Sequence, residues 1–103
     1  METKFGDIPQ IQWDKYKVSL SKAVFLPLPF YEDNYDKLEE YFDSLLLQLY
    51  GLNELLQYHE NVIAVIVLLE GARRELHSED FNIKVYRKSI LDAFNLIKKI
   101  GGV

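Results

Sequence analysis

The sequence contains no cysteine, which excludes disulfide bonds and thiolate metal ligands. Small secreted proteins commonly depend on disulfides, so this absence favours a reducing compartment. The first residues also lack the charged, apolar and small-residue regions of a signal peptide. The longest apolar run, Val62 to Leu69, is far shorter than the roughly 20 residues that span a bilayer. These absences predict a cytoplasmic protein without membrane association.

Glycine and proline are scarce, with five and three residues respectively, whereas 49% of the 103 residues are apolar. This composition is typical of a globular chain rather than a disordered one. The length predicts a single domain over residues 1–103. Residues 1–12 show no clear apolar period, and Pro9 disfavours a helix before it. We therefore expect these first residues to form a less ordered arm.

Strong positive charge is also lacking, because the net charge is −4 and the longest runs of adjacent cations are the short pairs Arg73-Arg74, Arg87-Lys88 and Lys98-Lys99. Nonspecific nucleic-acid binding requires clustered cations, so we expect no nucleic-acid partner. Glycine-rich phosphate loops, nucleophile elbows and Glu-x-x-His metal motifs are absent from the sequence. We therefore predict no catalytic residue, no cofactor, no metal and no enzyme. Arg73 and His77 resemble the Arg-to-His pair of helical HEPN ribonucleases, but fewer residues separate them, and we interpret them as helix-end residues.

Two long segments repeat apolar residues at alternating spacings of three and four, the pattern of a helix that packs along another helix. The first follows a possible cap at Asp33 or Asn34, and the second follows Ser78. The repeating positions are Tyr35, Leu38, Phe42, Leu45, Leu49, Leu52 and Leu56 in the first segment, and Ile83, Tyr86, Ile90, Ala93, Ile97 and Ile100 in the second. The sequence therefore predicts an all-α fold, a compact antiparallel bundle of three or four helices.

Two other segments are compatible with either a helix or a strand. Residues from Asp14 to Val24 fit both periods, and the β-branched run from Val62 to Leu69 has strand propensity. A strand needs partners, and these stretches are too few to build a well-paired sheet. We therefore expect helices in both places, the second over Asn61–Leu76. The prolines within residues 25–30 predict an extended crossover after the first helix.

Carboxylates concentrate in residues 32–43, which contain six of them against the single cation Lys37. On a helix, Asp36, Glu40 and Asp43 share one strip and Glu39 lies beside it. A solvated helix start explains several of these carboxylates, because negative charge is favourable near a helix N-terminus. The functional alternative is a docking surface for a basic partner. Tyrosine is common at interfaces, so the candidate binding residues are Asp36, Glu40, Asp43, Glu39, Tyr31 and Tyr41.

The segment from Leu26 to Leu38 resembles the part of barstar-type ribonuclease inhibitors that reads Leu-Pro-x-Tyr-Tyr-Gly-x-Asn-Leu-Asp-x-Leu and leads into the inhibitory helix. The run Ser89-Ile90-Leu91-x-x-Phe94 is similar to a later helix of that family, and the two stretches cover about a quarter of the chain. Glu32 stands where the family has a turn glycine, and Glu39 where it has a tryptophan. The resemblance implies a small α/β barstar-like fold as the alternative, with Asp36 as the principal inhibitory acid and Glu40 as its neighbour.

Together these patterns predict an acidic protein-binding module without enzymatic activity. The most specific form of this hypothesis is an inhibitor, immunity or antitoxin-like protein that docks on a basic partner through its acidic helix. The alternative is a structural bundle that self-associates as a homodimer within a larger assembly, because the wide apolar seam over residues 45–56 needs burial.

Overall fold

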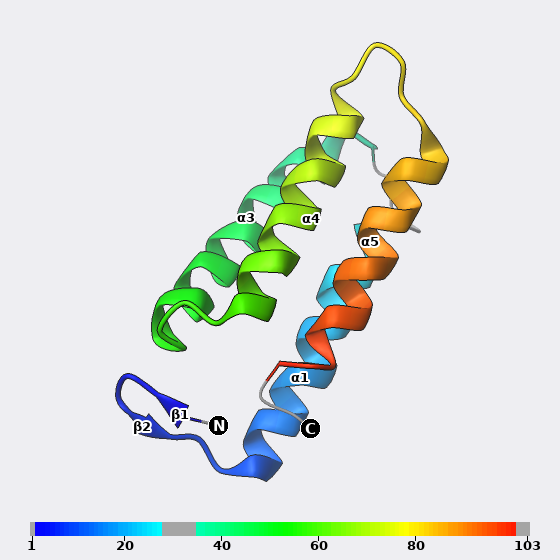
Figure 1. Ribbon diagram of the computed structural model, residues 1–103. Coiled ribbons are helices and arrows are strands. Elements are labelled where there is room, and N and C mark those ends of the chain that lie inside the picture. The colour runs from blue at the N-terminus through cyan, green and yellow to red at the C-terminus, as the bar shows by residue number, and fades with distance from the viewer. Residues whose placement is uncertain (1, 28–34, 101–103) are drawn as a thin grey trace.

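The computed structural model describes residues 2–27 and 35–100, without the side chains of Tyr35 and Asp36. Its helices are α1 (Gln10–Phe25), α3 (Tyr35–Leu55), α4 (Glu60–Leu76) and α5 (Ile83–Ile97). Two strands, β1 (Glu2–Thr3) and β2 (Gly6–Asp7), form a small antiparallel hairpin. The four helices run up, down, up and down the long axis of the molecule (Figure 1). The prediction of an all-α antiparallel bundle is confirmed, and the described residues do not adopt the alternative α/β fold.

Helix α4 lies between α3 and α5, and α1 packs against α5 (Figure 1). One continuous apolar core joins the four helices, and the seams expected in residues 35–56 and 83–100 supply much of it. Ile83 was expected in the second seam but is 40% exposed, and the side chain of Tyr35 is not described. Its largest fully buried side chains include Trp13 and Leu20 from α1, Phe42 and Leu49 from α3, Leu69 from α4, and Tyr86, Ile90 and Ile97 from α5. The leucines of the α3 seam are therefore buried within a single chain.

The ends of the helices follow capping rules, with one correction to the sequence prediction. Asn82, and not Ser78, caps α5, because its Oδ1 accepts hydrogen bonds from the backbone amides of Lys84 and Val85. The backbone amide of Asn82 in turn donates to Oε1 of Glu75, at 2.7 Å. Ser78 accepts from the amide of Asp80 and so closes a turn before the helix. Serine and asparagine are both good caps. The hydrogen bond from the amide of Asn82 to Glu75 on α4 favours Asn82 as the cap.

The predicted arm of residues 1–12 is wrong over its last residues, 10–12, since α1 already begins at Gln10, directly after Pro9. Proline is tolerated there because the first amides of a helix have no intrahelical acceptor. The crossover prediction is also wrong at its described residues: Phe25 ends α1, and Leu26 retains helical backbone angles. The remainder of that crossover, residues 28–30, lies outside the described residues. The proposed caps Asp33 and Asn34 lie outside them too.

Long-range hydrogen bonds hold the ends of the helices together. The indole Nε1–H of Trp13 donates to the backbone carbonyl of Ile100, and the Tyr86 hydroxyl donates to the carbonyl of Pro27. The hairpin is attached by the amide of Lys4, which donates to the carbonyl of Leu55 at the end of α3. The bonds of Trp13 and Lys4 bring the beginning of α1, the hairpin and the ends of α3 and α5 to one end of the bundle. The bond of Tyr86 joins the end of α1 to the first turn of α5 at the other end.

Candidate functional site

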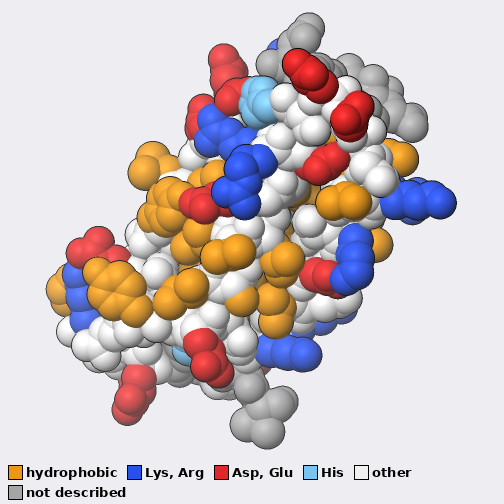
Figure 2. Space-filling model, turned by 45° about the horizontal axis from the view of Figure 1, so that its top comes forward, with side chains coloured by type: hydrophobic (Ala, Val, Ile, Leu, Met, Phe, Trp, Pro, Cys, Tyr) orange, Lys and Arg blue, Asp and Glu red, His pale blue; other side chains and the backbone are white. Residues whose placement is uncertain are grey.

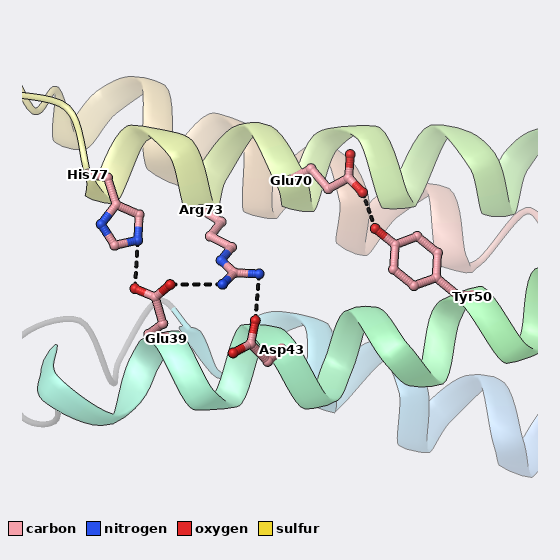
Figure 3. A network of polar contacts seen from close by, with 6 residues as sticks. All are labelled: Glu39, Asp43, Tyr50, Glu70, Arg73 and His77. Atoms are coloured by element: carbon pink, nitrogen blue, oxygen red, sulfur yellow. Dashed lines mark hydrogen bonds and ion pairs between the residues drawn. The ribbon is translucent and has the colours of Figure 1, made fainter.

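Four charged or polar side chains connect α3 to α4 at the outer surface of the bundle (Figure 3). Arg73 on α4 places Nη2 at 2.8 Å from Oε1 of Glu39 and Nη1 at 2.5 Å from Oδ1 of Asp43. His77, one turn further along α4, donates from Nε2 to Oε2 of Glu39 at 2.6 Å. All four side chains are partly exposed, from 31% for Arg73 to 57% for His77. We call this group the Arg73 network.

The Arg73 network changes the electrostatics of one of the predicted binding residues. The pKa of Glu39 lies below its usual value, first because of the hydrogen bond from Arg73 and then because of the nearby positive charges. The pKa of Arg73 is raised for the corresponding reason, the bond to Glu39. Both oxygens of Glu39 and both terminal nitrogens of Arg73 are used within the chain. This arrangement joins two helices by mutual neutralisation and leaves less negative charge on the surface than the sequence suggests.

Acid unfolding provides a test of the Arg73 network. A carboxyl group with a lowered pKa in the folded state stabilises the fold above its unfolded-state pKa, and this contribution is lost as the pH falls through the folded-state pKa. Replacing Arg73 with methionine should therefore flatten the loss of stability below about pH 4.5, the usual pKa of Glu39. Urea unfolding at several pH values measures this slope. Arg74→Met, at the exposed neighbour of Arg73, is the matched control, and equal slopes in the two variants would contradict the network.

The six predicted binding residues differ in where the structure places them. Tyr31 and the side chain of Asp36 lie outside the described residues. Glu39 and Asp43 are brought together by Arg73, and Glu40 is exposed to solvent. Tyr41 is half-buried, its hydroxyl donates to the backbone carbonyl of Ala23 on α1, and burial raises its pKa. The Tyr41 ring is therefore committed largely to packing between α1 and α3.

Sequence reasoning missed the cross-helix partners Arg73 and His77. The signal that predicts them is the short turn between α3 and α4, because residues equally far before and after such a turn face each other in an antiparallel pair. Glu39 and His77 satisfy this relation, as do Asp43 and Arg73. The helix-end interpretation of His77 is consistent with its position, since it is the C-cap residue of α4.

An exposed apolar patch lies next to the Arg73 network on the same helix pair. Leu47 and Tyr50 belong to α3, and Ile63 and Val67 belong to α4. The Tyr50 hydroxyl donates to Oε1 of Glu70, which places these two helical stretches side by side (Figure 3). Leu47 is 72% exposed and Val67 is 56% exposed. Figure 2 shows hydrophobic side chains gathered over the middle of this side of the molecule, with acidic and basic side chains grouped next to them.

The described residues also bear on metal binding and on membrane insertion. Among the described side chains, those of residues 2–27 and 37–100, no three His, Asp or Glu are grouped so that they could hold a metal ion. Within the same residues, none of the helices has the length and apolar character needed to cross a membrane.

The chain matches no protein-family model, no curated protein and no solved structure. The resemblance to barstar-type inhibitors therefore stays a prediction. Most of the segment that carries it, residues 28–34 and the side chain of Asp36, is also outside the described part of the chain.

Proposed function

We propose that this protein is a non-enzymatic, cytoplasmic binding module whose outer α3–α4 face docks on another protein. The observation that carries the proposal is the exposed patch of Leu47, Tyr50, Ile63 and Val67, which is formed by the acidic helix α3 and by α4. Contiguous apolar surface of this kind is typical of interaction sites. Aromatic and aliphatic anchors surrounded by polar groups are the usual anatomy of a protein interface.

The charge of α3 supports a basic partner. The helix contains five carboxylates and the single cation Lys37. Although Arg73 neutralises part of this charge, Glu40 remains exposed and unaffected by that network. Complementary charge increases the rate and specificity of association. The most specific form of the proposal is an inhibitor, immunity or antitoxin-like protein whose carboxylates, Asp36 and Glu40 first, occupy a basic site on the partner.

Affinity capture from the source cells tests this surface when a double variant of the α3–α4 face is compared with a double variant elsewhere on the molecule. Glu40→Lys combined with Leu47→Lys should reduce recovery of the specific partner by at least about tenfold, as expected when a central interface residue is lost. The fold should remain within about 1 kcal/mol of the wild type, because both side chains are exposed.

The matched control carries Glu79→Lys with Val18→Lys, which likewise replaces one acidic and one apolar side chain by lysine, at exposed positions on the α4–α5 turn and on α1. A partner, identified by mass spectrometry, should be retained by this control and by the wild type. Equal recovery with both double variants would remove the docking role of the α3–α4 face.

A second candidate function is self-association, which is favoured by the separation of charge between helices. The stretch from Ile83 to Ile100 carries five cations and one carboxylate, in contrast to the acidic α3. Figure 2 accordingly shows Lys and Arg side chains, in blue, along the edge of the molecule where Figure 1 places α5. The α5 face of a second copy could meet the acidic α3–α4 face of the first. Light scattering at low and high salt separates the two candidate functions. A protein that is monomeric at both salt concentrations excludes self-association.

A further inference from the structure

A pocket of about 440 Å³ lies at the end of the bundle opposite the Arg73 network. Its walls come from three parts of the chain: Ile8 after the hairpin, Gln12, Trp13 and Tyr16 from the first turns of α1, and Gly51, Leu52 and Leu55 from the end of α3. The volume is within the range of small-molecule sites, which are concave, mainly apolar and provided with a few polar groups.

Gly51 occupies this wall without a structural reason for being glycine. It lies inside α3, its φ is not in the left-handed region, and a Cβ built there meets no atom within 4 Å. Glycine in a helix interior lowers stability relative to alanine, because it loses more backbone freedom on folding. Neither backbone conformation nor close packing compensates for this loss. What the missing side chain does provide is open space over α3 at the pocket wall.

Gly71 in α4 differs from Gly51 in its surroundings. A Cβ at Gly71 would lie 3.9 Å from the guanidinium of Arg74, which covers that position. Gly71 does not line the pocket. It is therefore a control for any effect of a helical glycine that is unrelated to the pocket.

The chemistry of the lining defines the ligand. None of the seven lining residues has a side chain with a formal charge at neutral pH, and an ionised ligand would lose its hydration without gaining a counter-charge. The rings of Trp13 and Tyr16 lie beside each other, with centroids 5.7 Å apart. The Tyr16 hydroxyl accepts a hydrogen bond from Nε2 of Gln48, so its own O–H can donate to an acceptor on the ligand.

We propose that this pocket binds a small neutral molecule with an aromatic or alicyclic body and a hydrogen-bond acceptor, and that Gly51 keeps the pocket open for it. The site is separate from the α3–α4 face, so this proposal does not depend on the proposed protein-binding function. The partly exposed Ile8 and Leu55 and the buried Leu52 supply further apolar surface to the lining.

Fluorescence titration with N-phenyl-naphthylamine, a neutral aromatic probe, tests the proposal on the full chain. Trp13 is the only tryptophan, so a probe bound in the pocket must quench Trp13 emission while its own emission rises. We expect saturable binding of one probe per chain in the wild type and in Gly71→Ala. In Gly51→Leu the added side chain fills the pocket, and we expect affinity to fall by at least about tenfold, as for any steric exclusion from a site. The anionic probe anilinonaphthalene sulfonate should bind the wild type more weakly than the neutral probe.

The variants also report on the fold, because Gly51→Ala and Gly51→Leu should both raise the midpoint of thermal unfolding. If Gly51→Leu fails to fold, the titration of the wild type with the neutral and the anionic probe still tests whether the pocket binds a neutral ligand. Trp13 emission that does not respond to the neutral probe overturns the proposal. Probe affinity that is equal in Gly51→Leu and Gly71→Ala overturns it too, as does tighter binding of the anionic probe.

Discussion

Replacing Trp13 with alanine is expected to lower the free energy of unfolding by about 3–5 kcal/mol, the usual cost of removing a large buried ring. Trp13 is only 1% exposed, and its indole N–H bonds to the carbonyl of Ile100 at 3.1 Å. The alanine variant loses the buried apolar area, creates a cavity and leaves that carbonyl without its donor. Since a domain of this size has about 5–15 kcal/mol in total, the variant should be largely unfolded at moderate urea concentrations.

Two further variants separate the causes of this loss. Trp13→Phe retains most of the ring volume and removes the donor, so it should cost about 1–3 kcal/mol, the penalty for an unsatisfied buried carbonyl. Ile11→Ala lies on the same helix, but Ile11 is 72% exposed, and its effect should stay within about 0.5 kcal/mol. Urea unfolding followed by circular dichroism measures all three. Comparable losses for Trp13→Ala and Ile11→Ala would mean that α1 does not dock on α5 through Trp13.

Trp13 also marks where the sequence prediction of α1 stops short. Within the expected helix from Asp14 to Val24, the residues at helical spacing do pack on the core: Tyr16, Leu20, Ala23 and Val24, of which Leu20 and Val24 are fully buried. The indole extends this face by one turn and is held by Ile100, a residue from the other end of the chain. Local periodicity cannot supply such a contact, because it depends on how α1 and α5 are packed. The arm was therefore predicted to be longer than it is.

The acidic helix shows the same limit at the candidate site. Sequence spacing places Asp43 in the predicted strip and Glu39 beside it, and both are partly exposed. Their contact with Arg73 depends on the register of α3 against α4, which the turn between the helices sets. Gln57 and Tyr58 adopt left-handed backbone angles in that turn, although neither is glycine or asparagine, the residues that usually signal this conformation. The backbone conformation of the turn therefore had no clear local signal, although the position of the turn midway between the two helices is consistent with the pairing of Asp43 with Arg73.

Leu69→Ala is expected to destabilise the fold by about 2–5 kcal/mol, whereas Val67→Ala should stay within about 0.5 kcal/mol of the wild type. Leu69 is fully buried and Val67 is 56% exposed, because positions two apart on a helix face different directions. In a strand, Val65, Val67 and Leu69 would share one face. The paired substitutions therefore test the α-helical structure of a segment whose β-branched composition favours a strand.

The helix prevails over this local propensity because α4 must pack against two neighbours at once. Val65 and Leu69 are fully buried and belong to the core that joins the helices, and burial of such side chains contributes about 1.5–3 kcal/mol each. Helix-propensity differences for valine and isoleucine are below about 0.7 kcal/mol per residue, so two such contacts outweigh several unfavourable residues. Val67→Ala replaces a residue of low helix propensity at an exposed position, and its effect on the free energy of unfolding should be neutral or slightly stabilising in urea unfolding. A loss from Val67→Ala as large as that from Leu69→Ala would instead place both side chains in a buried face and contradict the position of α4.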